Sequence, residues 1–180
     1  VAVDDLEPAN SGNTAQRSLS APLGVSNLAI NHYRLDPGER TAGLHAHERQ
    51  TEVFVVLAGR ATFETLTTTV EVEAGDAVSF APGEHKSGLN QTDDPVEILA
   101  IGAPPDGGDV FVPLECPACG HPECRLAIDD GAEGLVCREG GHGRSPACPV
   151  CGGTALRAVL DADRGRPVSA CLECGERFEA

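Results

Sequence analysis

Several residue types are rare or missing in this sequence of 180 residues. It contains no Met or Trp and a single Tyr, and aromatic residues make up only 3% of the chain. It has no apolar run near the roughly 18 residues that a membrane-spanning helix needs, and no charged-then-apolar leader, so we expect a mature, soluble protein. It also lacks a nucleophile triad, a phosphate-binding glycine loop and a dinucleotide fingerprint, so any catalysis would fall to a metal.

Turn-forming residues are plentiful, with 21 Gly and 13 Pro, and 41% of the residues are hydrophobic. This composition favours short strands and many turns over long helices. The length suits one domain of about 100–120 residues together with a small additional region.

Acidic residues strongly outnumber basic ones in the sequence. The formal net charge is −15, from 28 acidic and 13 basic residues, and Lys86 is the only lysine. Such a surface repels phosphates, so nucleic acid is an improbable partner. At molar salt the Debye length falls to about 3 Å, and dense carboxylates then keep a protein hydrated. We therefore predict a halophilic, cytoplasmic protein; an acidic surface without that meaning is the alternative.

Strand-like stretches recur at short intervals through the first half of the chain and predict an all-β barrel or sandwich. They cover residues 28–35, 52–58, 60–66, 69–73, 77–80 and 96–101. Residues 1–24 are polar and are predicted to form an N-terminal arm, and the Pro- and Gly-rich residues 104–113 are predicted to form a linker. The predicted barrel domain thus spans residues 25–103.

Two clusters of polar residues stand out within this barrel region. His45 and His47 lie two residues apart, so on a strand their side chains point the same way. Glu52 opens the apolar strand 52–58, and His85 follows a Pro-Gly turn. Three imidazoles and one carboxylate suit a divalent transition metal.

These clusters resemble the two motifs of the cupin superfamily. The first motif is met by His45, His47, Glu52 and Gly59, with Gly38 one residue further upstream than the family pattern. The second is met by Gly75, Pro82, Gly83, His85 and Asn90, but the Pro sits one residue late and the Gly-to-His gap is one residue short. The resemblance implies a double-stranded β-helix, a jelly-roll barrel with His45, His47, Glu52 and His85 as metal ligands. It also implies barrels that pair as homodimers.

Four protein ligands leave one or two metal positions open for water, substrate or dioxygen. Fe, Mn, Ni, Co and Zn all suit this ligand set. We expect a metal-dependent barrel that acts on or binds a small oxygenated molecule, as an oxygenase, isomerase or decarboxylase, with Glu52 as the candidate base. The candidate substrate contacts are Tyr33, Arg40 and Gln50. We expect Arg49 to lie at the solvated surface and His32 to have no function. The alternative is a non-enzymatic sensor of ligand or metal.

All eight cysteines lie after residue 115, in a region that we call the tail (residues 114–180). In a cytosolic protein such cysteines indicate metal rather than disulfides. Cys148 and Cys151 are separated by nineteen residues from Cys171 and Cys174, which is the spacing of a Cys₄ zinc ribbon. We predict a zinc ribbon over residues 146–180, module 2.

Residues 114–145, module 1, carry a less regular version of this pattern. Cys116 and Cys119 form one Cys-x-x-Cys turn, and Cys137 follows after seventeen intervening residues, but position 140 is Gly. His142 is our predicted fourth ligand, and Cys124 and His121 are the alternative ligands. A further alternative is that module 1 binds no metal. The tail thus holds one or two structural zinc ions, and it docks a protein partner, supports dimer contacts or serves as a stable appendage.

Overall fold

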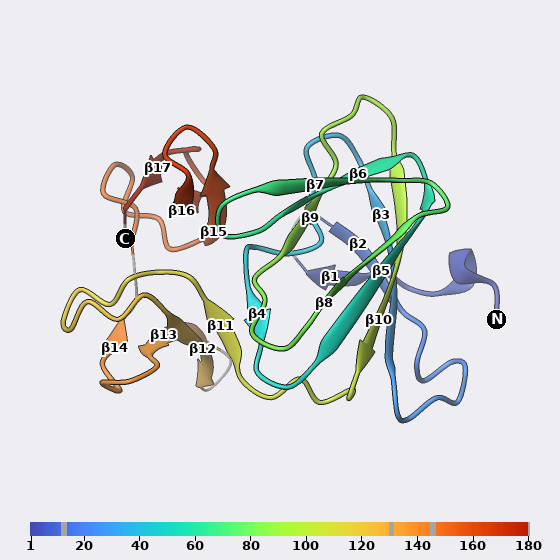
Figure 1. Cartoon of the computed structure of the whole chain (residues 1–180), viewed down its shortest axis with the longest axis horizontal. Coiled ribbons are helices and arrows are strands. Elements are labelled where there is room, and N and C mark those ends of the chain that lie inside the picture. Colours follow the sequence, from blue (N-terminus) through green and yellow to red (C-terminus); the bar gives the residue numbers. More distant parts are fainter. Residues whose placement is uncertain (12–13, 130–131, 145–146, 180) are drawn as a thin grey trace.

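The structure is a computed structural model that describes residues 1–11, 14–129, 132–144 and 147–179. Apart from one 3₁₀ turn, η1 (Val3–Asp5), its regular elements are all strands (Figure 1). The predicted all-β fold class is confirmed. Within these ranges no helix has the length and apolarity required to cross a membrane.

Two sheets face each other to form the barrel (Figure 1). The larger sheet has the order β1-β2-β3-β10-β5-β8 and the smaller one the order β7-β6-β9. The strands of the larger sheet are β1 (Ala9–Ser11), β2 (Thr14–Ser18), β3 (Ala29–Leu35), β10 (Val96–Ala103), β5 (Thr51–Ala58) and β8 (Ala77–Phe80). Those of the smaller sheet are β7 (Thr69–Glu73), β6 (Arg60–Glu64) and β9 (Ser87–Leu89).

The barrel core lies between these two sheets and centres on three phenylalanines. The ring centroid of Phe54 lies 5.0 Å from that of Phe63 and 6.0 Å from that of Phe80. Val56 is completely buried two residues after Phe54, because alternate residues of β5 point into the barrel. Glu52 shares this face of the strand and is only half-buried, which places a carboxylate where the apolar interior ends.

The six strands expected in the barrel region are all present, with ends that differ by at most two residues. The two connecting regions contain strands that periodicity did not reveal. In the arm, β2 pairs with β3 and extends the larger sheet. In the expected linker, β11 (Val110–Val112) pairs with β4 (Ala46–His47) on one side and β12 (Cys124–Asp129) on the other. Both are short strands that depend on a partner distant in sequence.

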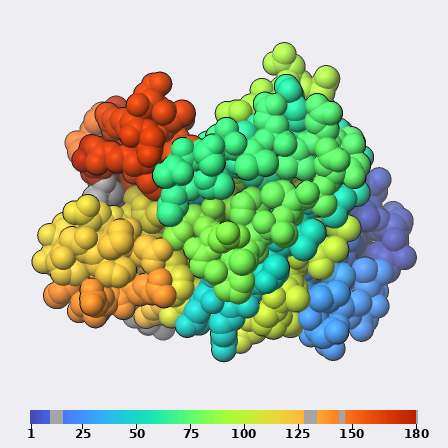
Figure 2. Space-filling model, viewed as in Figure 1, coloured from blue at the N-terminus to red at the C-terminus, as the bar shows by residue number. Residues whose placement is uncertain are grey.

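The tail forms two small sheets beside the barrel (Figures 1 and 2). Module 1 belongs to a sheet of order β14-β13-β12-β11-β4, and module 2 to a sheet of order β15-β16-β17. Their remaining strands are β13 (Ala132–Cys137), β14 (Gly143–Arg144), β15 (Leu156–Asp161), β16 (Arg166–Cys171) and β17 (Arg177–Phe178). The predicted boundary between the modules, at residues 145–146, lies outside the described residues.

The tail and the barrel share a second, smaller core. Leu44, from the barrel region, is 1% exposed and packs with Leu114, Leu135 and the buried cysteines of module 1. Ala158 of module 2 belongs to the same cluster, and its carbonyl accepts a 2.7 Å hydrogen bond from the amide of Leu44. The chain segment just before His45 is therefore buried by both modules.

A buried ion pair also joins the barrel to module 2. The guanidinium of Arg40 donates two hydrogen bonds to the Glu64 carboxylate, of 2.6 and 2.8 Å, and a third to the hydroxyl of Ser87. Glu64 Oε2 also accepts from the backbone amide of Leu160 in β15. Both charged residues are less than 10% exposed, so each depends on the other for solvation.

Glu64→Gln is expected to destabilise the protein by about 3 kcal/mol, because it leaves the buried charge of Arg40 without its partner. Glu71→Gln is the matched control, since the Arg60–Glu71 pair on the neighbouring strands is exposed at both ends and should change stability by less than about 0.5 kcal/mol. Urea unfolding followed by circular dichroism measures both values, because the protein has no Trp. Equal effects of the two variants would contradict this account.

Candidate metal centre

Three side chains converge at one end of the barrel. His45 lies just before β4, His47 ends that strand, and Glu52 lies near the start of β5. One potential ligand atom from each residue lies within 4.8 Å of the others, and all three are half-buried. The imidazole rings of His45 and His47 meet edge to face, with centroids 5.0 Å apart. The predicted convergence of these three residues is thus present in the structure.

His45 is held in the form that a metal ligand requires. Its Nδ1 lies 2.7 Å from the carbonyl oxygen of Gly43, which can only accept a hydrogen bond. Nδ1 must therefore carry the proton, and the lone pair of Nε2 is left free. Burial lowers the pKa of His45 to about 3, and the nearby Lys86 contributes to the same effect, so the ring stays neutral.

Glu52 provides the negative charge of the group. Burial acts to raise its pKa, but a hydrogen bond from His47 and the positive charge of Lys86 outweigh burial and lower the pKa to about 2. Its Oε2 lies 3.3 Å from Nε2 of His47. The carboxylate is therefore ionised at any physiological pH.

Lys86 is the fourth residue at this centre. Its ammonium forms a close ion pair with Oε2 of Glu52, and its side chain is 3% exposed. Burial lowers the pKa of Lys86, and the carboxylate of Glu52 partly offsets this effect. Lys86 was not among the residues predicted for the site.

Strand register explains why Lys86 rather than His85 reaches the group. Lys86 pairs directly with His45 in an antiparallel bridge, with backbone hydrogen bonds of 2.9 and 3.2 Å in the two directions. Residues directly opposite each other in such a pair share a face, and the preceding residue points the other way. His85 accordingly lies on the far side, where its Nε2 is 3.6 Å from Oε1 of Glu123 in module 1. The structure does not bring His85, predicted as a ligand, to the group of His45, His47 and Glu52.

The sequence contained a signal of this arrangement. The gap from Gly75 to His85 is one residue shorter than the second cupin motif requires, so position 86 occupies the place of the motif's histidine. A shift of one residue moves every side chain to the opposite face of a strand. Counting from Gly75 would have identified Lys86.

Two of the predicted substrate contacts have structural roles. The side-chain amide of Gln50 is buried and donates a 2.7 Å hydrogen bond to the carbonyl of Pro104. Arg40 is held in the buried pair with Glu64, beside a groove of about 610 Å³ that the three converging residues do not line. Tyr33 packs against the barrel core, where burial and the charge of Glu52 raise the pKa of its hydroxyl.

The two residues predicted to have no part in a site lie elsewhere. Arg49 has an exposed side chain that pairs with Asp106 at 3.0 Å and with Glu48. His32 is buried on β3, and its Nε2 lies 3.7 Å from Oε2 of Glu97. Neither residue belongs to the group of His45, His47 and Glu52.

The donor set of the barrel fits a divalent metal. Two imidazoles and one carboxylate form a three-residue set that suits transition metals and leaves positions open. Nδ1 of His47 is buried without a hydrogen-bond partner, so that ring is not committed to a structural bond at that atom. The fourth position of the motif holds the ammonium of Lys86, which cannot ligate a metal while it is protonated.

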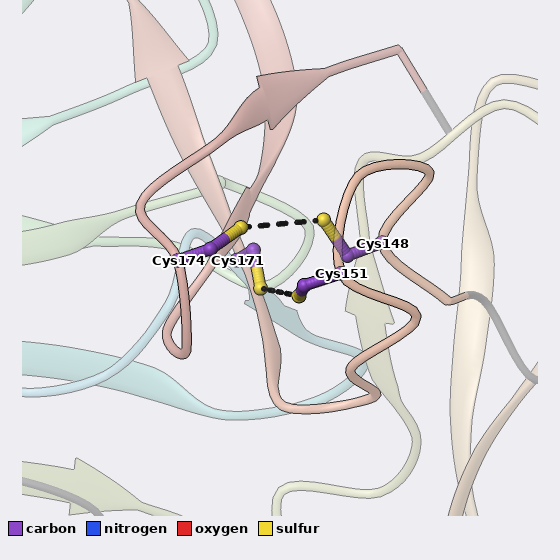
Figure 3. A group of neighbouring side chains, drawn as sticks. All are labelled: Cys148, Cys151, Cys171 and Cys174. Carbon is purple, nitrogen blue, oxygen red and sulfur yellow. Dashed lines mark hydrogen bonds between the residues drawn. The ribbon is translucent and has the colours of Figure 1, made fainter.

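The tail brings its cysteines together in two groups. In module 2, Sγ of Cys148 lies 3.5 Å from that of Cys174, and Sγ of Cys151 lies 3.6 Å from that of Cys171 (Figure 3). These four sulfurs lie within 4.8 Å of one another, a geometry compatible with zinc. In module 1, Cys116, Cys119 and Cys137 form a corresponding group of three.

The fold is shared with known structures at low sequence identity. A sugar phosphate isomerase from a cupin superfamily, from Silicibacter pomeroyi, is 17% identical over 78% of this chain and 94% of that chain, with a TM-score of 0.61. A conserved protein with a double-stranded β-helix domain from Klebsiella pneumoniae is 19% identical over 60% of this chain and 91% of that chain, with a TM-score of 0.52. Such likeness shows the fold alone. The comparison with curated proteins found no match.

The comparison with protein families agrees with the fold. Residues 31–102 match the family described as "Cupin domain". This range begins within β3 and ends within β10, and it contains all three converging side chains. The barrel of this chain therefore has the double-stranded β-helix fold, and its residues 31–102 are similar to cupin domains.

Proposed function

We propose that the barrel holds one divalent transition metal through His45, His47 and Glu52 and binds or transforms a small oxygenated anion beside it. The convergence of the three ligand atoms within 4.8 Å carries this proposal. Fe, Mn, Ni, Co and Zn all suit two imidazoles and a carboxylate. A metal held there supplies Lewis acidity toward an oxygen of the bound molecule.

Lys86 narrows the class of ligand to anions. When Glu52 serves as a metal ligand, its negative charge is shared between the metal and the ammonium of Lys86. The positive charge of Lys86 is then only partly balanced, and it attracts a second anion. A small carboxylate placed in the open metal position would meet this ammonium. Glu52, the only carboxylate of the group, has two roles in the proposal, as ligand and as the candidate base. Oxygenase, isomerase and decarboxylase chemistry all begin from such a bound molecule.

Manganese binding tests the ligand set. The full chain is expected to bind one equivalent of Mn(II), and His47→Ala is expected to abolish this binding, because two donors are insufficient. Electron paramagnetic resonance of free Mn(II) measures the stoichiometry, and thiolate sites do not interfere because Mn(II) prefers oxygen and nitrogen ligands. His32→Gln, at a buried His outside the group, is the control and should bind as the wild type does. Undiminished binding by His47→Ala would refute the site.

Lys86→Met tests the role of the ammonium. Removing a positive charge beside Glu52 is expected to tighten Mn(II) binding at least about tenfold, since unit charges 4 Å apart interact by about 4 kcal/mol at an effective dielectric constant of 20. The same variant should lose affinity for pyruvate and glycolate in the presence of Mn(II). Isothermal titration calorimetry measures both effects. Weaker metal binding would instead identify Lys86 as a neutral amine ligand and would contradict the proposed anion contact.

A second function is favoured by one further observation. His47 lies in β4, which pairs with β11, and β11 pairs with β12 of module 1. A change in the position of His47 thus acts directly on the sheet of the tail. The second candidate is a sensor in which metal or ligand occupancy changes the tail and so its docking to a protein partner or to a second copy of the chain.

Hydrogen–deuterium exchange tests the sensor. Saturation of the full chain with Mn(II) is expected to slow exchange severalfold in peptides from residues 110–129, because a fixed His47 strengthens the hydrogen bonds of β11. His47→Ala with the same Mn(II) concentration is the control and should show no change. Unchanged exchange in the metal-bound wild type would exclude this route to the tail.

A further inference from the structure

The four cysteine turns of the tail share one backbone pattern. In each turn the amide of the first Cys bonds the carbonyl five residues later, and the amide four residues later bonds the carbonyl of that Cys. The residue four after the Cys is always a glycine in the left-handed region, where φ is positive. The turns begin at Cys116, Cys137, Cys148 and Cys171, and the glycines are Gly120, Gly141, Gly152 and Gly175.

Three of these turns place a second Cys three residues after the first, and the turn of Cys137 does not. Gly140 stands there, at the position that Cys119, Cys151 and Cys174 occupy in the other turns. Its amide lies 3.3 Å from Sγ of Cys137, a hydrogen bond that stabilises a thiolate. The backbone of a zinc-binding turn is therefore present without its second thiol.

The imidazole of His142 fills the space left at Gly140. A Cβ atom built on Gly140 would lie 2.6 Å from Cδ2 and 2.8 Å from Nε2 of His142. It would also lie 3.7 Å from Sγ of Cys119, which is itself 3.4 Å from Sγ of Cys137. The His142 ring thus occupies the space into which a Cys side chain at position 140 would extend, and this space exists because Gly140 has no Cβ. The ring nitrogens are not among the ligand atoms that lie within 4.8 Å of one another in this group.

The two other candidates are placed differently. Cys124 pairs with Cys137 across β12 and β13, is completely buried in the apolar cluster with Leu44, and does not join the group of three thiols. His121 lies in the turn of Cys116, where its Nδ1 is 3.0 Å from the carbonyl oxygen and 3.1 Å from the amide nitrogen of Glu123.

We propose that module 1 is a Cys₃His zinc site in which Cys116, Cys119, Cys137 and Nε2 of His142 bind one Zn²⁺, and that module 2 binds a second Zn²⁺ through its four cysteines. Three thiolates and one imidazole form a complete tetrahedral zinc set, as four thiolates do. Each module is too small to stabilise its turns by burial alone, and a metal supplies the missing folding free energy.

Cadmium-113 NMR of the full chain, with Cd²⁺ exchanged for zinc, tests the proposal because the chemical shift falls as sulfur ligands are replaced by nitrogen. The wild type is expected to show two thiolate-type resonances, one typical of four sulfurs and one upfield of it, typical of three sulfurs and one nitrogen. The barrel site, with nitrogen and oxygen donors, gives a signal well separated from both.

The variants assign the upfield resonance. His142→Ala should shift or remove it and leave the four-sulfur resonance unchanged, whereas His121→Ala and Cys124→Ser should leave both in place. Gly140 does not have a positive φ, and the atoms nearest its built Cβ belong to the His142 ring, so a side chain is tolerated once that ring is gone. The double variant Gly140→Cys with His142→Ala should therefore show two four-sulfur resonances.

Three results would overturn the proposal. Two four-sulfur resonances in the wild type would assign Cys124 as the fourth ligand, and a single thiolate-type resonance would mean that module 1 binds no metal. An upfield resonance that is unchanged in His142→Ala would exclude the imidazole. The wild-type spectrum decides between the first two without any substitution.

Discussion

The segment from Gly43 to His47 is the part of the chain on which barrel, site and tail all depend. The carbonyl of Gly43 orients the ring of His45, and the amide of Leu44 bonds to Ala158 in module 2. His47 lies in β4, the edge strand of the sheet that contains module 1. Because the side chain of Leu44 is buried in the core that the barrel and the tail share, a displacement of the tail would also displace the segment that carries the two histidines. The tail is thus a structural support of the barrel's mouth.

Charge balance gives the centre its particular character. A buried carboxylate needs a cation, and in this barrel the covalently attached cation of Lys86 is available before any metal binds. A metal bound by Glu52, as proposed, would therefore compete with the ammonium for the same carboxylate oxygen. A cupin barrel with a third histidine in this place would have no such competition, since a neutral imidazole adds a donor without adding charge. Lysine in place of histidine would therefore favour an anion at the open side of the proposed metal site.

The two modules are small, and in the proposal a metal ion in each takes the place of an apolar core. Their recurring turn combines one left-handed glycine with two backbone hydrogen bonds, and it presents the side chain at the third position after the Cys. In module 1 the turn keeps its backbone but has glycine at position 140, and the proposed donor is the imidazole at position 142. The glycine at 140 is as much a part of this arrangement as the histidine, because any Cβ would collide with the ring.

Local patterns in the sequence were sufficient for much of the molecule. Alternation and turn residues identified the strands of the barrel, since one buried face imposes a period of two. The spacing of His45, His47 and Glu52 predicted their convergence, and the Cys-x-x-Cys pairs predicted the thiol groups, because these donors lie on short, rigid turns or neighbouring strand positions. The strands in the arm and in the expected linker were not predicted. Each is only three to five residues long and forms by pairing with a partner strand.

Only the tertiary structure decided which residue stands opposite His45. Pairing across β strands selects Lys86 and turns His85 toward Glu123, and a shift of one residue would have reversed the two. The same holds for Gln50 and Arg40, whose polar ends are used by partners more than twenty residues away. Composition and spacing describe a residue's chemistry and its near neighbours, but the direction of its side chain depends on strand register, and register is determined by packing between segments far apart in the chain.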